Sequence, residues 1–280
     1  MKIRCDRATL NESLNIVSKA VSKHTSLPIL NCILLQATRE HGFRLVTNDL
    51  EIGIETKPIV AEIIEPGELA LDARIFSDIV RNLPDGSVYI ESMSNYIVSI
   101  KSGETEFEIL GDQSDNFPSL PDVMTKTGLK VSSSKLKKMI RKTVFSVSLD
   151  ESRPFLTGEL FRVNNGTLTV ASTDNHRVSV NYTSVGNNDL NESIIVPRKT
   201  LGEIVKILDN DEESVAHIYF LERYIIFETN KAKVLSRVIE GKFIDIDLVL
   251  KTECTIIVTV VTRELLDCVE RAVLISRNKE

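Results

Sequence analysis

Apolar residues recur with helical spacing at three places along the chain. In each place, steps of four and then three positions put three residues on one helical face. The three sets are Leu10, Leu14 and Val17; Leu136, Ile140 and Thr143; and Leu265, Val269 and Ala272. Similar patterns predict a second helix after each of the first two. The expected helices span residues 7–22, 73–83, 133–146 and 198–208.

Between these helices, apolar and polar residues alternate as they do in half-buried strands. Short turns separate neighbouring alternating runs, which predicts antiparallel hairpins. The expected hairpins pair residues 43–47 with 51–55, 88–90 with 96–100, 167–170 with 177–180, and 217–220 with 224–227. Antiparallel sheets with helices gathered on one side make an α+β fold.

The chain repeats itself at an interval of about 126 residues. Pro28 and Pro154, the turns beginning at Thr47 and Thr173, and Phe117 and Phe243 each lie 126 positions apart. A period of this length is that of a whole domain and not of a solenoid repeat. We therefore expect residues 1–125 and 126–250 to superpose as two copies of one domain.

Residues 251–280 resemble the beginning of a third copy, because Leu265, Val269 and Ala272 continue the helical series. The strands and second helix of the first two copies have no counterpart before Glu280. We expect a fragment, an engineered truncation or a gene product that lost its end. Residues 252–280 are expected to be the least stable part, because their apolar face has no sheet to cover it.

Composition bears on whether the chain enters a membrane, is exported or stays in a reducing compartment. Hydrophobic residues make up 42% of the chain, yet no apolar run is long enough for a membrane span. The N-terminus has no apolar signal core, so we expect no export. The scattered cysteines Cys5, Cys32, Cys254 and Cys268 indicate buried free thiols in the reducing cytoplasm.

The net charge of −6 argues by itself against a nucleic-acid partner, but the distribution of charge changes that conclusion. The segment from Ser134 to Lys142 carries five cations and no acid. The other predicted helices add cations, while acids concentrate in the hairpins. A single charge run is usually a solvated helix face. Together, however, these helices favour one basic surface that contacts phosphates without reading bases.

A catalytic alternative rests on Asp174 and His176, which lie in a turn between two predicted strands. A hydrolase would need a nucleophile or further metal ligands, and no such motif accompanies this pair. The structural alternative is that the Asp side chain holds the turn through backbone N–H groups. We expect no catalysis, no metal and no cofactor.

Several short motifs carry a resemblance that extends from Met1 to the end of the chain. They are Leu27-Pro28-Ile29-Leu30, Thr47-Asn48-Asp49-Leu50-Glu51, Phe117-Pro118-Ser119-Leu120, Thr173-Asp174-Asn175-His176-Arg177, Val196-Pro197-Arg198-Lys199 and Gly241-Lys242-Phe243. With them the chain resembles the bacterial sliding clamp family, the beta subunit of DNA polymerase III. The resemblance implies tandem clamp domains with antiparallel sheets outside and two helices per domain inside. It also implies a homodimer in which three domains per chain close a head-to-tail ring.

The resemblance and the basic helices together name residues that face DNA: Lys23, His24, Arg74, Lys138, Arg141, Arg153, Arg198 and Lys199. The resemblance also implies a groove on the second copy for clamp-binding peptides. Its residues are Leu156, Thr173, His176, Arg177, Val178, Ile244, Leu248 and Val249. Departures from the family are Asn175 for Gly, Ile244 for Pro, Leu248 for Arg, Pro154-Phe155 for paired tyrosines, and the absence of the C-terminal residues that complete the groove.

The implied function is that of a non-catalytic processivity factor of DNA polymerase III in the cytoplasm. Its expected partners are duplex DNA of any sequence, the polymerase III alpha subunit and the clamp loader, and not a membrane. Ring closure is not expected of a chain that lacks most of a third domain. The alternatives are a truncated clamp that binds partners without encircling DNA, and a hydrolase that uses Asp174 and His176.

Overall fold

The computed structural model describes residues 1–22, 25–120, 128–186, 189–251 and 255–276. The chain divides into two compact units, Met1–Phe243 and Ile244–Glu280. The described part of the smaller unit contains helices α5 (Ile246–Leu250) and α6 (Thr262–Ser276). Along α6, Leu265 and Val269 are half exposed. Within the described ranges, no helix is long and apolar enough to cross a bilayer.

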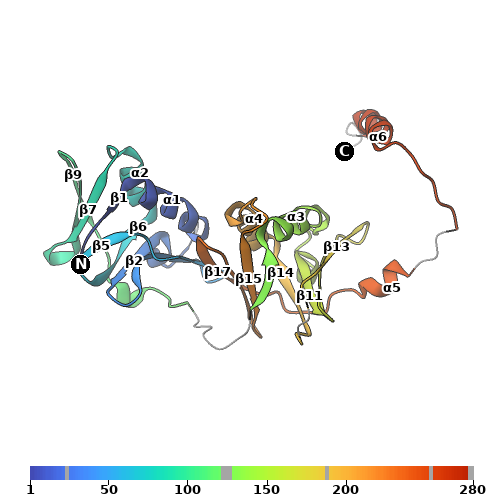
Figure 1. Ribbon diagram of the computed structural model, residues 1–280, viewed down its shortest axis with the longest axis horizontal. Helices are drawn as coiled ribbons and strands as arrows, with labels where there is room; N and C mark the ends of the chain where they lie inside the picture. The colour runs from blue at the N-terminus through green and yellow to red at the C-terminus, as the bar shows by residue number, and fades with distance from the viewer. Residues whose placement is uncertain (23–24, 121–127, 187–188, 252–254, 277–280) are drawn as a thin grey trace. The chain divides into compact units, whose positions relative to one another are not determined.

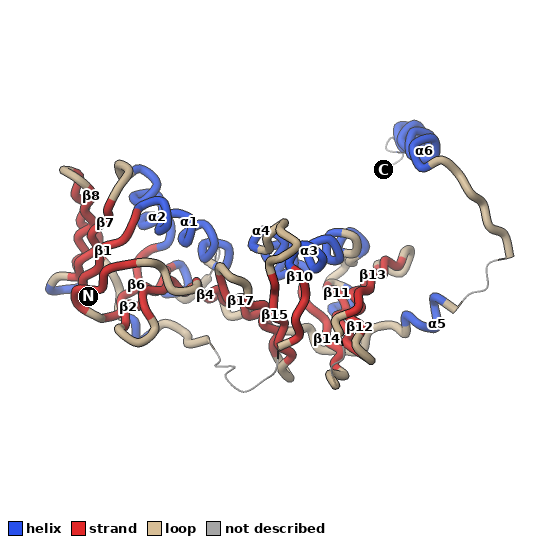
Figure 2. Tube along the Cα trace, in the orientation of Figure 1, coloured by secondary structure: helices blue, strands red, loops and turns tan. Residues whose placement is uncertain are grey.

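Each copy of the repeat contributes two helices to the larger unit. The first copy has α1 (Arg7–Val17) and α2 (Ala73–Asn82), and the second has α3 (Ser133–Arg141) and α4 (Arg198–Ile207). Asp6 and Asp72 cap α1 and α2 by accepting hydrogen bonds from Thr9 N at 2.9 Å and Ile75 N at 2.8 Å. Figures 1 and 2 show all four helices on the same side of the sheets in this unit.

Two of the predicted helices are shorter in the structure. The helix expected at 7–22 ends at Val17 and continues as a 3-10 turn over Ser18–Ala20. The helix expected at 133–146 ends at Arg141, and a 3-10 turn follows at Val144–Ser146. Thr143 leaves the helical region with φ −121°, and its hydroxyl donates back to Met139 O at 2.9 Å. Such local bonds compete with continued helix.

The strands confirm the predicted hairpins and add others. The first copy has β1 (Lys2–Asp6), β2 (Cys32–Thr38), β3 (Gly42–Asn48), β4 (Ile52–Thr56), β5 (Ala61–Glu65), β6 (Gly67–Asp72), β7 (Ser87–Ser92), β8 (Ile97–Ser102) and β9 (Thr105–Leu110). The second has β10 (Leu129–Ser132), β11 (Gly158–Asn164), β12 (Thr167–Thr173), β13 (Val178–Ser184), β14 (Glu192–Pro197), β15 (Val215–Phe220), β16 (Tyr224–Glu228) and β17 (Ala232–Arg237). They form sheets in the orders β5-β1-β7-β8-β9, β10-β15-β16-β17-β4-β3-β2-β6 and β13-β12-β11-β14.

The sheet orders show that the two copies share one topology. The order β1-β7-β8-β9 recurs as β10-β15-β16-β17, and β4-β3-β2-β6 recurs as β13-β12-β11-β14. The alignment of the turn that begins at Thr47 with the turn that begins at Thr173 is wrong by one residue. The cause is the loop between β11 and β12, which is one residue shorter than the loop between β2 and β3. Asp49 Oδ1 accepts from the backbone N–H groups of residues 51 and 52, and Asp174 Oδ1 accepts from those of 176 and 177. Asp49 is therefore equivalent to Asp174, at an offset of 125 and not 126.

The two copies are joined by a backbone ladder. Strand β4 of the first copy pairs antiparallel with β17 of the second, with Ile54 opposite Val234 and Gly53 opposite Leu235. Ion pairs flank the ladder, among them Lys231 with Glu12 at 3.5 Å and Lys57 with Glu228. Strands β9 and β13 hold the places of β17 and β4 in the other copies, and among the described residues they are sheet edges.

The core lies between the helices and the sheets. The predicted apolar faces of α1 and α3 are buried, including Leu10, Leu14, Leu136 and Ile140. Among the described cysteines, Cys5 is buried and Cys32 is partly buried, as expected, and burial raises the pKa of the Cys5 thiol to about 12. The expectation of burial is wrong for Cys268, which is exposed on α6, and Cys254 lies outside the described residues.

Candidate functional site

Helix α3 exposes most of its cations on the face opposite its buried residues. Lys135, Lys138 and Arg141 are exposed, and so is Lys142 just after the helix. Lys138 lies 3.7 Å from Glu212, and both side chains are more than half exposed. An exposed pair of this kind holds its charges weakly, so the Lys138 ammonium remains available to another anion.

One cation of α3 differs from its neighbours. Lys137 is partly buried, donates to Leu208 O at 2.8 Å and has a pKa lowered by that burial. Its ammonium satisfies the carbonyl that follows α4 and so ties the two helices of the second copy together. The side chain is a structural contact and was not among the DNA-facing residues expected from the sequence.

Helix α4 begins with two cations that have different surroundings. Arg198 is exposed at the first position of the helix. Lys199 Nζ instead lies 2.6 Å from Asp49 Oδ2 and 3.2 Å from Glu51 Oε2, both in the first copy. Although burial lowers the pKa of Lys199, these two carboxylates raise it above its usual value. Lys199 therefore bridges the two copies at the joint, while its side chain remains 55% exposed.

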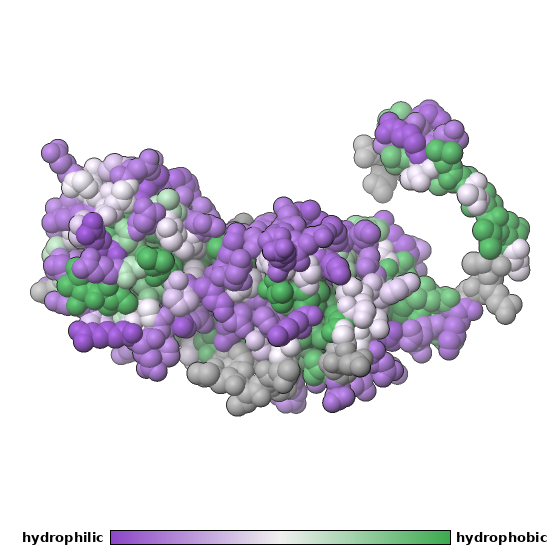
Figure 3. Space-filling view, viewed as in Figure 1, coloured by the Kyte–Doolittle hydropathy of each residue, from purple (hydrophilic) through white to green (hydrophobic). Residues whose placement is uncertain are grey.

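The remaining residues that the sequence analysis expects to face DNA lie partly within and partly outside the described residues. Arg74 is exposed near the start of α2, and Arg153 is exposed just before the 3-10 turn Pro154–Leu156. Lys23 and His24 lie outside the described residues. Figure 3 shows hydrophilic side chains covering α3 and α4, in agreement with their exposed cations.

Of the residues expected in the groove, Thr173, His176, Arg177 and Val178 lie at the turn between β12 and β13, while Leu156 ends the 3-10 turn Pro154–Leu156. Leu156 and Thr173 are buried, Val178 is partly exposed and His176 is exposed. Arg177 donates through Nε to Asp174 Oδ2 at 2.9 Å, and its guanidinium lies 5.5 Å from the centre of the Phe145 ring. The turn thus presents a fixed cation beside an apolar wall. Phe145 was missed in the sequence, where it lay inside a predicted helix.

The other groove residues belong to the smaller unit. Ile244 precedes α5, while Leu248 and Val249 are exposed on that helix. Asp245 caps α5 by accepting from Leu248 N at 3.2 Å. Asn175, where many family members have Gly, has φ 72°. Asn tolerates this left-handed region better than most residues, which explains how the turn keeps its shape without Gly.

The turn has little capacity for catalysis. Asp174 accepts hydrogen bonds from His176 N and Arg177 N, and these bonds, opposed by burial, lower the pKa of its carboxyl. Its other oxygen accepts from the Arg177 side chain. With both oxygens engaged in the turn, Asp174 is poorly placed to orient His176 as a base. Among the described residues, no group of three His, Cys, Asp or Glu could hold a metal ion.

Comparisons with known proteins agree along the whole chain. Residues 1–121 match the family described as DNA polymerase III beta subunit, N-terminal domain, and residues 130–245 match its central domain. The beta sliding clamp of Bacillus subtilis is 34% identical over 286 residues, which cover 99% of this chain and 75% of that protein. The Staphylococcus aureus beta sliding clamp is 32% identical, covering 94% of this chain and 71% of its own length.

Solved structures of DNA polymerase III beta subunits are also similar to this chain. A putative DNA polymerase III beta subunit from Eubacterium rectale has a TM-score of 0.91 at 40% identity, covering 98% of this chain and 74% of that one. A Bacillus subtilis sliding clamp has a TM-score of 0.86 at 32% identity, covering 90% and 68%. The chain therefore belongs to the DNA polymerase III beta subunit family, the sliding clamps, which act in DNA replication as non-catalytic processivity factors.

Proposed function

We propose that the exposed cations of α2, α3 and α4, together with Arg153, face duplex DNA. The observation that carries this proposal is the arrangement of all four helices on one side of the joined sheets, with Arg74, Lys138, Arg141 and Arg198 exposed. Lysine and arginine at this density attract phosphates of any sequence, and such contacts permit sliding because they do not read bases. Lys23 and His24 stay in this set on the family resemblance alone.

The proposal includes head-to-tail pairing between two chains, as in the homodimer that the family resemblance implies. Strand β9 is a sheet edge at the place where the second copy has β17, which pairs with β4. The matching registers make Phe107 equivalent to Val234, because each lies opposite the equivalent residue of the preceding strand. Phe107 is 39% exposed, whereas Val234 is fully buried in the joint. An edge of this kind suits a β4-like strand from a neighbouring chain.

The second-copy groove is proposed to take clamp-binding peptides of the polymerase III alpha subunit and the clamp loader in the cytoplasm. Its support in the larger unit is the partly exposed Val178 beside the cation of Arg177. The apolar side chain suits a hydrophobic anchor and the guanidinium suits an acidic neighbour. Ile244, Leu248 and Val249 remain in the proposed groove through the resemblance.

Replacing Lys138, Arg141 and Arg198 together with Ala is expected to weaken binding to duplex DNA and to flatten its salt dependence. Each lost phosphate contact should reduce the slope of log affinity against log salt by about 0.9, or by roughly 2.7 for three contacts. Fluorescence anisotropy of a labelled duplex between about 50 and 200 mM salt would measure this slope.

Lys199→Ala is the matched control, because that ammonium lies against Asp49 and Glu51. We expect this variant to lose stability at the joint while its salt slope stays close to that of the unmodified chain. A triple variant with an unchanged slope would remove the basic helices from the DNA interface. Equal retention on circular and linear DNA would instead favour a clamp that binds without encircling.

Val178→Asp is expected to weaken the binding of an acidic peptide with a leucine anchor. Its dissociation constant should rise at least about tenfold, which corresponds to about 1.4 kcal/mol of binding free energy. The new carboxylate would place a charge in the apolar part of the groove and repel the acidic side chain of the peptide. Titration calorimetry of one such peptide with the unmodified chain and with the Val178→Asp variant would measure the change in dissociation constant. An unaltered affinity would place the peptide elsewhere on the chain.

A further inference from the structure

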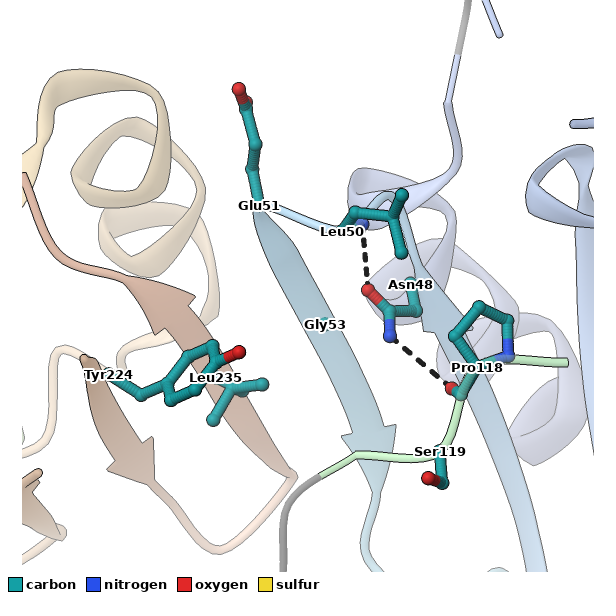
Figure 4. A pocket seen from close by; sticks show the side chains of 8 residues that line it. All are labelled: Asn48, Leu50, Glu51, Gly53, Pro118, Ser119, Tyr224 and Leu235. Atoms are coloured by element: carbon teal, nitrogen blue, oxygen red, sulfur yellow. Dashed lines mark hydrogen bonds between the residues drawn. The ribbon is translucent and has the colours of Figure 1, made fainter. Parts of the chain in front are cut away.

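A hollow of about 270 Å³ lies beside the ladder that joins the two copies. Figure 4 shows Asn48, Leu50, Glu51 and Pro118 of the first copy on one side of it. Tyr224 and Leu235 of the second copy lie on the other side. Both copies therefore build its walls.

The hollow is the first-copy equivalent of the proposed peptide groove. Because Asp49 is equivalent to Asp174, its neighbours Asn48, Glu51 and Gly53 are equivalent to Thr173, His176 and Val178. Pro118 follows Phe117 as Ile244 follows Phe243, at an offset of 126. All four first-copy residues line the hollow. The hollow thus lies at the first-copy turn that is equivalent to the turn of the proposed peptide groove.

Hydrogen bonds hold the first-copy walls in place without a ligand. Asn48 is 7% exposed, and its Oδ1 accepts from Leu50 N at 2.8 Å. Its Nδ2 donates to Pro118 O at 3.3 Å, which fastens the segment after Phe117 to the turn. Because the amide is engaged on both sides, the turn and the Pro118 segment keep a fixed separation. A ligand would find the site already formed.

Size and lining select the kind of ligand. The volume lies just below the range of about 300–1,000 Å³ that is usual for small-molecule pockets, so it suits one anchoring side chain. Leu50, Leu235, Pro118 and the ring of Tyr224 supply apolar surface. Leu50 lines the hollow and is 47% exposed, so it adds apolar surface that a ligand can reach. An apolar side chain is the matching anchor.

The rim differs in charge from the second-copy groove. Glu51 stands at the position of His176, and its side chain is 71% exposed. Lys199 lies closer to Asp49 than to Glu51, at 2.6 Å against 3.2 Å, and two carboxylates share this one ammonium. Among the residues that line the hollow, Glu51 is the one charged side chain, so the lining carries a carboxylate where the second copy has His176. A basic residue next to the anchor is complementary to it.

We propose that the first copy carries a second peptide-docking groove, which binds a short segment with an apolar anchor beside Lys or Arg. The inference rests on the proposed function of the second-copy groove and extends it to a partner of opposite charge. Two grooves with different charge preferences would let one chain hold two partners at once, each sorted by the residues that flank its anchor.

The test uses the 280-residue chain and two labelled hexapeptides, each with two adjacent leucines, flanked by lysines in one and by aspartates in the other. Leu50→Asn removes the apolar lining and suits the fold, because residue 50 has φ 73°, a region that Asn adopts readily. Glu51→Arg reverses the charge of the rim. Val178→Asp serves as the matched variant in the second groove.

We expect Leu50→Asn and Glu51→Arg each to weaken the lysine peptide at least about tenfold, while Val178→Asp leaves its affinity unchanged. For the aspartate peptide we expect Val178→Asp to weaken binding, while Leu50→Asn and Glu51→Arg leave its affinity unchanged. If Val178→Asp weakens both peptides and the first-copy variants weaken neither, the second groove exists alone and the inference is overturned. If first-copy variants weaken the lysine peptide but no variant affects the aspartate peptide, the inference holds and the second-copy groove fails.

Discussion

Replacing Glu159 with Gln is expected to remove most of the pH dependence of stability between about pH 5 and 8. The unmodified chain should lose about 1.4 kcal/mol of unfolding free energy for each pH unit in this window, and roughly 4 kcal/mol at most across it. The variant should therefore be nearly as stable as the parent at low pH and more stable at pH 8.

The surroundings of Glu159 explain this expectation. The side chain is fully buried on β11, and burial raises its pKa to about 8 against the opposing effect of a hydrogen bond with Thr143. Its Oε1 lies 3.1 Å from Thr143 Oγ1, and its Oε2 has no hydrogen-bond partner among the described residues. The Thr143 hydroxyl can donate to Glu159 Oε1 or to Met139 O at 2.9 Å, so the carboxyl shares this one donor with the end of α3.

The direction of the effect follows from proton binding. The ordinary pKa of Glu is 4.5, so between that value and about 8 the native state keeps a proton that the unfolded state releases. Stability therefore falls as pH rises through this window. Urea unfolding at pH 5.5, 6.5 and 7.5 would measure it, with exposed Glu151→Gln as the surface control. Parallel pH profiles for the parent and Glu159→Gln would show that the carboxyl is ionised in the fold.

Phe161→Ala is expected to lower the unfolding free energy by about 3–5 kcal/mol. The Phe161 and Phe227 rings come from different sheets of the second copy and meet edge to face, with centroids 5.8 Å apart at 78°. Both side chains are fully buried, so truncation loses apolar burial and leaves a cavity where the two sheets meet.

Denaturant unfolding of the same chain would measure this loss. Tyr182→Ala is the matched control, because that aromatic side chain is 73% exposed and should change stability by less than about 0.5 kcal/mol. A loss for Phe161→Ala no larger than for the control would mean that the two sheets do not depend on this contact.

The periodicity of the sequence predicted most of the fold because the sheets and helices bury what the pattern indicates. The helices at 73–83 and 198–208 are correct to within one residue, since each has a strong apolar face. The helix at 133–146 was too long, because apolar spacing continues through Thr143 although its hydroxyl bonds back to the helix. Side-chain bonds of this kind leave no periodic signal.

The site was less predictable than the fold, since charge alone does not reveal a partner within the chain. The sequence places Lys199 beside Arg198 as a second cation, but only the joined sheets bring it to Asp49, 150 residues earlier. Lys137 was one of five cations on a predicted helix, and only the packing of α4 shows that it serves Leu208 O. Such roles depend on contacts between distant segments, which residue spacing does not encode.

The ladder between β4 and β17 also bears on how a duplicated gene diverges. Main-chain N–H and C=O groups make its bonds, so nearly any residue that fits the pleat can occupy it. Equivalent strands β9 (TEFEIL) and β17 (AKVLSR) share no identical residue at any of their positions, yet both keep the same register with the strand before them. Equivalent strands of the two copies can thus differ in every side chain and in charge while each keeps its backbone pairing with the strand before it.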